Sequence, residues 1–360
     1  MPQIVGPFSI VGSSAIPIET HAAYLRHLAS SKVARMLLQE KYTFTPKEAQ
    51  KYSADISSFV GQALNFYEDS LDCSRRIRPV LQYYCYLNLA VAVVLAYRPN
   101  YYEKYRRHGV VDKSHALNSL NLTSVLVEAN VGAVPLFHSI LSGVSIRNRK
   151  FRLNELFGAI HLVQFELTRL FNISTQQIKV DISTFQERNT TLYHNKVEYI
   201  ITSPLESEPR ISKSRIENAM PDLVQHYKLH DATSNKLVYH SHTGYADEND
   251  AIQDHQSKCL RLINFGGHVV LEQGQINRGL VYSWHGISRK ALLPTMTATL
   301  LLSFALASIS RYRSTLLRRI DESEIQVLLD VFMSEADSIV LPTMRNLLFK
   351  EEVACDMISV

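Results

Sequence analysis

The feature that most constrains the fold is the apolar run at residues 77–97, which reads IRPVLQYYCYLNLAVAVVLAY. Pro79 stands near its start, where its fixed φ suits a helix and its missing N–H would have no partner in the first turn. Apolar residues then recur every three or four positions, with small alanines on the other side, which predicts a helix covered over most of its circumference. A membrane span is the alternative, but the run falls short of the roughly 20 apolar residues that a bilayer requires. We therefore expect a buried helix at the centre of a core.

A second apolar segment lies near the other end of the chain, at residues 291–310. It contains no charged residue and is long enough to cross a membrane. Its proline, threonines and serines are atypical of a membrane helix, and they favour the central buried helix of a water-soluble core. We expect this helix to lie beside the helix at residues 77–97.

Periodicity predicts further helices on both sides of these two. Thr45-Pro46-Lys47-Glu48 has the pattern of a helix start, with Thr45 as N-cap and Glu48 at the capping-box position. This helix should run to about residue 72 and form an antiparallel pair with the next one. The prolines in residues 1–20 favour an extended arm or edge strand. Helical spacing also occurs at residues 21–40, 152–171, 322–337 and 341–352.

The pattern changes in the middle of the chain, where β-branched or alternating segments are separated by glycines and polar residues. The sequence therefore predicts an α+β fold that is mainly α: a helical bundle formed by both chain ends, with a small inserted antiparallel β unit. The expected units are an N-terminal helical domain at residues 1–175, a β-rich insert at 176–288, and C-terminal helices at 289–360 that pack on the N-terminal domain. The predicted strands are residues 177–184, 197–202, 236–240, 267–271 and 279–283.

The two apolar helices also carry a family resemblance. The first resembles the signature helix of the YaaC-like family of prokaryotic proteins, through Arg78-Pro79, Leu81, Tyr83-Tyr84 and Leu87-Asn88-Leu89-Ala90. The second, LLSFALASISRY at residues 301–312, is similar to another hydrophobic helix of that family. Arg107-His108-Gly109 and the basic run at residues 147–151 resemble weaker family features. The resemblance extends from about residue 50 onward and implies a shape; the family brings no established activity with it.

One short motif could carry catalysis. Arg188 and His194 are spaced as in the R-x(4–6)-H motif of HEPN-type ribonucleases, which the segment resembles. A histidine near neutral pKa can move the proton of a 2′-hydroxyl, while an arginine holds the phosphate. HEPN motifs belong on a helix, however, whereas this segment lies beside predicted strands. Arginine and histidine also occur at this spacing by chance, so both interpretations stay open.

A second set of residues lies at the ends of the two apolar helices. If the helices pack side by side, these residues would form a basic pocket with aromatic walls, suited to a phosphate, a nucleotide or a carboxylate. The alternative is that the arginines cap helix ends and pair with Glu68, Asp69 or the C-terminal acidic residues. The set comprises Arg78, Tyr83, Tyr84, His108, Arg311 and Tyr312.

The basic run Arg147, Arg149, Lys150 and Arg152 is interrupted by Phe151. Such a run could contact a nucleic-acid backbone, with Phe151 stacking on a base. The alternative is a solvated helix start.

Composition excludes several functional classes. The 360 residues carry a formal net charge of +4, and the four cysteines are scattered without metal-binding spacing, which favours a reduced cytoplasmic protein. The N-terminal residues lack the features of a signal peptide. Glycine-rich nucleotide motifs are absent, so we expect no cofactor. We also expect no metal, because no carboxylate stands at a spacing that would complete a ligand set with histidines 240 and 242.

The sequence thus favours a non-enzymatic binding or assembly module, placed by its resemblance in a prokaryotic multi-protein or antiphage defence system. We expect a partner protein, with RNA or a phosphate-bearing ligand as alternatives and a homo-oligomer allowed, and we expect no membrane. The alternative function is a metal-independent HEPN-like ribonuclease using Arg188 and His194.

Overall fold

Helices from both ends of the chain surround α4 (Arg78–Tyr97), the helix expected at residues 77–97. The computed structural model describes residues 9–10, 17–104, 106–114, 121–142, 145–173, 176–189, 192–202, 213–219, 221–233, 236–246, 270–272, 275–277, 279–284 and 293–352. The other helices are α1 (Ile18–His27), α2 (Ser31–Tyr42), α3 (Pro46–Asp72), α5 (Pro99–Lys104), α6 (Ala133–Ser142), α7 (Leu153–Gly158), α8 (Gln164–Phe171), α9 (Lys213–Ala219), α10 (Pro221–His226), α12 (Thr295–Tyr312), α13 (Ser314–Asp321), α14 (Ile325–Phe349) and the 3₁₀ turn η1 (His161–Val163).

The strands form small sheets. Their bounds are β1 (Ser9–Ile10), β2 (Val110–Asp112), β3 (Leu126–Ala129), β4 (Arg149–Arg152), β5 (Gln176–Asn189), β6 (Leu192–Thr202), β7 (Tyr227–Ala232), β8 (Lys236–Ser241), β9 (Val270–Glu272), β10 (Gln275–Asn277), β11 (Gly279–Trp284) and β12 (Glu351–Glu352). An antiparallel sheet has the order β11-β5-β6-β8-β7, and a second has the order β2-β3-β4. β1 pairs with β12, which joins the two ends of the chain.

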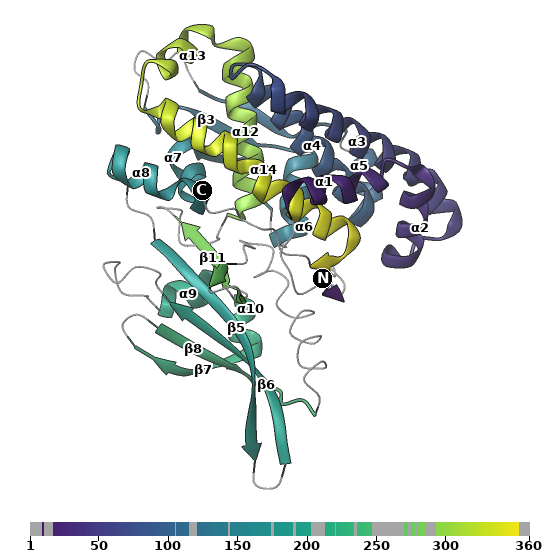
Figure 1. The fold of residues 1–360 in the computed structure, drawn as a ribbon, viewed down its shortest axis with the longest axis vertical. Coiled ribbons are helices and arrows are strands. Elements are labelled where there is room, and N and C mark those ends of the chain that lie inside the picture. The colour runs from purple at the N-terminus through teal and green to yellow at the C-terminus, as the bar shows by residue number, and fades with distance from the viewer. Residues whose placement is uncertain are drawn as a thin grey trace.

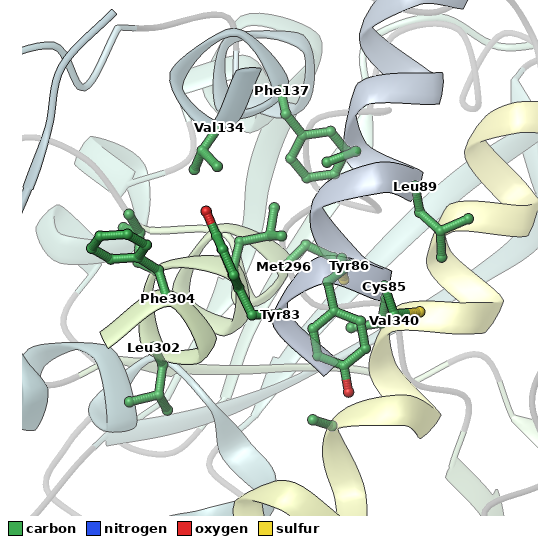
Figure 2. Close-up of a cluster of buried hydrophobic side chains, with 14 of the residues drawn as sticks. Tyr83, Cys85, Tyr86, Leu89, Val134, Phe137, Met296, Leu302, Phe304 and Val340 are labelled. Carbon is green, nitrogen blue, oxygen red and sulfur yellow. The ribbon is translucent and has the colours of Figure 1, made fainter. Parts of the chain in front are cut away.

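The core lies where α4 contacts α3, α6, α12 and α14. The rings of Tyr83 on α4 and Phe304 on α12 pack with centroids 5.5 Å apart, and Figure 2 shows both rings with Phe137 of α6 and Val340 of α14 nearby. The two apolar helices therefore lie together, as expected. In Figure 1 the helices around α4 occupy the upper part, and the sheet containing β5 and β6 extends below them, with α9 and α10 beside it. The predicted fold class, mainly helical α+β with an inserted antiparallel β unit, is confirmed.

α3 begins as its sequence predicts. The hydroxyl of Thr45 accepts the backbone N–H of Glu48 at 3.3 Å, and the Glu48 carboxylate accepts the N–H of Thr45 at 3.0 Å. These reciprocal bonds satisfy two N–H groups that have no partner inside the helix.

α4 has the length and composition of a membrane-spanning helix. Among the described residues it is the one helix long and apolar enough to span a bilayer, but 72% of its apolar window is buried inside the protein. The core helix of a soluble protein passes the same test, so this finding is weak support for a span.

Four predicted helices differ from the structure in where they are continuous. The helix expected at residues 21–40 is two helices, with Ser30 as the N-cap of α2. The helix expected at 152–171 is broken between α7 and α8. At the break, the Gln164 amide donates to the carbonyls of Phe157 (2.9 Å) and Ile160 (2.6 Å). The helices expected at 322–337 and 341–352 are largely one helix, α14, with Pro342 inside it.

The local sequence does not explain why α14 continues through Pro342. A proline inside a helix costs roughly 3 kcal/mol, but α14 contacts α1, α4, α8 and η1 along its length. Tertiary packing therefore outweighs the local preference for a break. β7, α9 and α10 were not predicted, and neither was the β2-β3-β4 sheet within the segment expected to be helical.

Candidate functional site

A pocket of about 730 Å³ opens where the ends of α4 and α12 meet β2. It brings together five of the six residues predicted to form a basic pocket: Tyr83, Tyr84, His108, Arg311 and Tyr312. We call it the basic pocket. Its lining also includes Leu87, Val110, Val111, Asp112, Phe304, Ser308 and Arg313.

Arg311 is held in the basic pocket by aromatic rings and neutral acceptors. Its Nη1 donates to the Tyr84 hydroxyl at 2.7 Å, and its Nε donates to the carbonyl of Ala307 at 3.2 Å. The guanidinium also lies 5.5 Å from the ring centroid of Tyr84 and 5.0 Å from that of Tyr312. Among the acidic side chains that the structure describes, none forms an ion pair with Arg311. The guanidinium keeps N–H groups that could bind an anion.

Arg313, by contrast, is neutralised. Its Nη2 lies 3.0 Å from Oδ2 of Asp112 and donates to the carbonyl of Ser114 at 2.7 Å. The Asp112 carboxylate also accepts the Ser308 hydroxyl at 3.2 Å and the N–H of Ser114 at 2.8 Å. Asp112 is therefore fully engaged inside the protein, and Arg311 is left as the unmatched charge of the basic pocket.

His108 contributes a neutral ring. Its Nδ1 accepts the N–H of Val110 at 3.2 Å, so the neutral imidazole carries its proton on Nε2. Burial and the nearby Arg311 guanidinium lower the pKa of His108 below its ordinary value, which keeps the ring uncharged at neutral pH. The ring packs 5.5 Å from that of Phe304. His108 can therefore donate a hydrogen bond from Nε2 without adding positive charge.

Tyr83 contributes a buried hydroxyl that no described protein atom satisfies. Tyr83 is 1% exposed, and Figure 2 shows its hydroxyl on the side of Val134 and Phe304, away from the hydroxyl of Tyr86. Burial raises the pKa of Tyr83, which keeps the hydroxyl protonated. An unsatisfied buried hydroxyl costs about 1–3 kcal/mol.

Arg78, the sixth residue of the predicted set, lies elsewhere. Its Nη2 is 3.9 Å from Oδ2 of Asp337 on α14. Arg78 thus matches the alternative prediction, in which an arginine pairs with a C-terminal acidic residue, although Glu68 pairs with Arg26. The structure does not place Arg78 beside Arg311.

Most of the basic run at residues 147–152 is a strand, and only its last residue, Arg152, begins a helix, as the N-cap of α7. Arg149 and Lys150 lie on β4, whereas Arg147 precedes it. Phe151 is 1% exposed, and the Arg149 guanidinium lies 5.0 Å from its ring centroid. The proposed stacking role of Phe151 was wrong, because the alternation of a strand turns this ring into the core. Arg147 and Lys150 are exposed and remain able to contact a polyanion.

Arg188 and His194 lie in the ladder between β5 and β6. Arg188 pairs with Tyr193, and Glu187 pairs with His194, so the two residues occupy successive pairs of an antiparallel hairpin. Successive pairs in a ladder belong to opposite faces of a sheet. A HEPN motif belongs on a helix, so this backbone context does not favour the resemblance. The contacts of these two side chains fall outside the description, and their catalytic role stays a prediction.

Sequence reasoning missed the part of the basic pocket that comes from β2. Asp112 and Ser308 fix the position of Arg313, but they are far apart in the sequence and lack a shared motif. The signal that could have found Arg313 is its place directly after Arg311-Tyr312.

Comparisons with known proteins support one assignment. No curated protein and no solved structure matches the chain. A model of the YaaC-like protein family matches residues 26–348, which include both apolar helices and every lining residue of the basic pocket. This chain therefore belongs to the YaaC-like protein family.

Proposed function

We propose that this chain is a non-enzymatic binding module that holds the anionic group of a ligand in the basic pocket. The observation that carries the proposal is Arg311, which is fixed by Tyr84 and Tyr312 without a described carboxylate to neutralise it. A planar guanidinium with N–H groups to spare binds phosphate or carboxylate through paired hydrogen bonds. The neutral Nε2–H of His108 supplies a further donor.

The same residues support binding over catalysis. Nδ1 of His108 already accepts the N–H of Val110, so the neutral ring has no free lone pair with which to take a proton. Asp112 is occupied by Arg313, Ser308 and Ser114. The two lining residues that could act as general bases are thus both engaged, which favours a site that holds a ligand without transforming it.

Thermal unfolding tests this proposal. Inorganic phosphate, pyrophosphate and uridine monophosphate would be added to the wild type and to the Arg311→Gln variant. At least one probe should raise the Tm of the wild type, because a ligand at about 100 times its Kd stabilises the folded state by about 2.7 kcal/mol. Arg311→Gln should lose that shift.

Arg318→Gln is the matched control, since Arg318 lies on the next helix, is exposed and does not line the basic pocket. It should keep the shift. The proposal is wrong if no anionic probe raises the Tm, or if Arg311→Gln and the wild type respond equally.

Other features of the predicted function stay predictions. They are a cytoplasmic location, a partner protein, a homo-oligomer, a role in a prokaryotic multi-protein or antiphage defence system, and the alternative HEPN-like ribonuclease. Labelled RNA incubated with EDTA separates the last of these from a binding module, since a ribonuclease would cleave it and a His194→Ala variant would not.

A further inference from the structure

The basic pocket is larger than the anionic group that Arg311 would hold. Its volume of about 730 Å³ falls within the range of about 300–1,000 Å³ that is usual for pockets binding whole small molecules. A phosphate or carboxylate group fills only a small part of such a volume. The remaining lining therefore bears on the rest of the ligand.

Two exposed apolar side chains line the basic pocket beside Arg311. Tyr312 is 74% exposed, the highest fraction among the large apolar side chains that the structure describes, and Val111 is 40% exposed. Tyr312 ends α12 and Val111 lies on β2, so the fold brings them to one pocket from distant parts of the sequence. Exposed apolar side chains gathered in a pocket are typical of a surface that contacts a ligand.

Aromatic rings surround the guanidinium of Arg311. It lies 5.5 Å from the ring centroid of Tyr84 and 5.0 Å from that of Tyr312, and Tyr312 keeps most of its surface exposed despite this contact. Exposed aromatic surface and a planar guanidinium both stack favourably on a flat ring. A ligand whose anionic group binds the N–H groups of Arg311 would therefore have its adjoining part against Tyr312.

The charge of the lining residues suits a single anionic group. Arg313 and Asp112 form an ion pair at 3.0 Å and together carry no net charge. Burial and the charge of Arg311 lower the pKa of His108, so its ring is neutral at neutral pH. Arg311 is thus the one unmatched charge among the residues that line the basic pocket. A second anionic group on the ligand would have no cation of its own there.

We propose that the basic pocket binds a small molecule that carries one anionic group beside a flat ring, with the anionic group at Arg311 and the ring against Tyr312. Aromatic carboxylates and nucleoside monophosphates share this chemistry. The inference rests on the proposed function, because it takes the anion at Arg311 as its starting point. Its new content is the ring and the surface that receives it.

Isothermal titration calorimetry with two matched pairs of probes tests the ring. The pairs are uridine monophosphate with inorganic phosphate, and indole-3-acetate with acetate. In at least one pair the ring-bearing anion should bind about tenfold or more tightly than its ringless counterpart. The neutral molecules uridine and indole, which lack the anionic group, should bind at least about tenfold more weakly than that anion.

Variants then assign each half of the ligand to its residue. Tyr312→Ala should weaken the ring-bearing anion about tenfold and leave the ringless anion unchanged, whereas Tyr312→Phe, which keeps the ring, should bind as the wild type does. Arg311→Gln should weaken every anion. If uridine monophosphate binds, uridine diphosphate should bind within about fivefold of it, because the second phosphate meets no unmatched cation.

Tyr101→Ala is the matched control. Tyr101 is also exposed, at 54%, and the guanidinium of Arg98 lies 5.9 Å from its ring centroid, but it does not line the basic pocket. Its loss should leave the binding of all probes unchanged.

The outcomes separate this inference from the proposed function. Preference for the ring in only one pair supports the inference and assigns the ligand to nucleoside monophosphates or to aromatic carboxylates. If anions bind through Arg311 but the ring adds nothing in either pair, or Tyr312→Ala binds the ring-bearing anion as the wild type does, the inference is wrong and the binding module stands. A diphosphate that binds much more tightly than the monophosphate contradicts the single anionic group. If no anion binds, both proposals fail.

Discussion

The hydroxyl of Tyr86 on α4 donates a hydrogen bond of 2.5 Å to Oδ1 of Asp337 on α14. Gln82, one turn earlier on α4, donates to Oδ2 at 3.3 Å and to the carbonyl of Met333 at 2.9 Å. Arg78, one turn earlier again, lies 3.9 Å from Oδ2. Positions 78, 82 and 86 follow the four-residue spacing of one helix face. A single buried carboxylate thus fixes how far α14 lies along α4.

Tyr86→Phe should lower the free energy of unfolding by about 1.5–3 kcal/mol, the usual range for a hydrogen bond to a charged group. The ring would remain in place, so the loss reports the hydroxyl and its bond to Asp337. Urea denaturation measures the change, with Tyr101→Phe as an exposed control that should stay within about 0.5 kcal/mol of the wild type. Equal losses in the two variants would show that the contact between Tyr86 and Asp337 contributes nothing to stability.

Asp337 should also make stability depend on pH. Burial raises the pKa of its carboxyl above the ordinary 3.8, and the Tyr86 hydrogen bond, the Arg78 charge and the Gln82 amide offset only part of that rise. The folded protein therefore holds this proton more tightly than the unfolded chain. The stability that it contributes is complete below pH 3.8 and is lost as the pH rises through the folded-state pKa.

Asp337→Asn removes this proton equilibrium. The difference in unfolding free energy between the wild type and the variant should therefore change across the acid range, with the wild type losing relative stability as the pH rises. Urea denaturation at a series of acid pH values measures that difference. A constant difference would contradict the expected shift in pKa.

Two helices and the basic pocket show which features the sequence could predict. α4 and α3 were predictable because their signals are local: a helical period, Pro79 near one start and the Thr45 capping box at the other. The basic pocket was predictable because its residues end two helices that were expected to pack together. In each case a short segment carried enough information.

Features that depend on one particular pair of distant residues were predicted less well. Arg78 was grouped with Arg311 by its place at a helix end, and its pairing with a C-terminal acidic residue was only the alternative; that residue is Asp337. Phe151 was assigned a stacking role because it interrupts a basic run, whereas pairing with β3 places it on a strand and buries the ring. Pro342 remains inside α14 because neighbouring helices hold that helix together.

Gly132→Ala should distort the basic pocket, although Gly132 does not line it. A Cβ at Gly132 would overlap the carbonyl of Arg107 and lie 2.5 Å from N and 2.6 Å from Cα of Gly109, which itself has a φ of 78°. These backbone atoms cannot move without moving the turn that carries His108. Hydrogen bonds from Val134 to the carbonyl of His108 (3.0 Å) and from Ala133 to that of Arg107 (2.7 Å) fix the same turn.

We expect Gly132→Ala to lower the unfolding free energy by about 1–3 kcal/mol and to weaken the anion-dependent rise in Tm. Gly61→Ala is the control, since a Cβ there would meet only the Cβ of Ala29 at an ordinary 3.7 Å. In the middle of α3, replacing glycine by alanine should stabilise the protein by up to about 1 kcal/mol. The argument fails if Gly132→Ala is as stable as the wild type and still responds to the anion.

His138 should make the free energy of unfolding depend on pH in the opposite direction to Asp337. It is buried between α6 and α12, with Nε2 2.9 Å from the hydroxyl of Ser142 and Nδ1 3.1 Å from that of Thr297. Burial and the charge of Arg149 lower the pKa of His138 from 6.5 to about 3. As the pH falls, the unfolded chain therefore takes up this proton at a higher pH than the folded protein does. The stability that His138 contributes is complete above pH 6.5 and is lost as the pH falls toward the folded-state pKa.

His138→Asn removes this titration and keeps a polar side chain for the two hydroxyls. Lowering the pH by about two units from neutrality should cost the wild type roughly 2 kcal/mol more than it costs the variant, measured by urea denaturation. The other histidines titrate in both proteins, so the difference isolates His138. If the variant is too unstable to denature reversibly, NMR titration of the wild type gives the same information, because the His138 ring should stay neutral well below pH 6.5. Equal pH dependence in both proteins, or a ring that gains its proton near its ordinary pKa, would show that the folded protein does not keep His138 neutral.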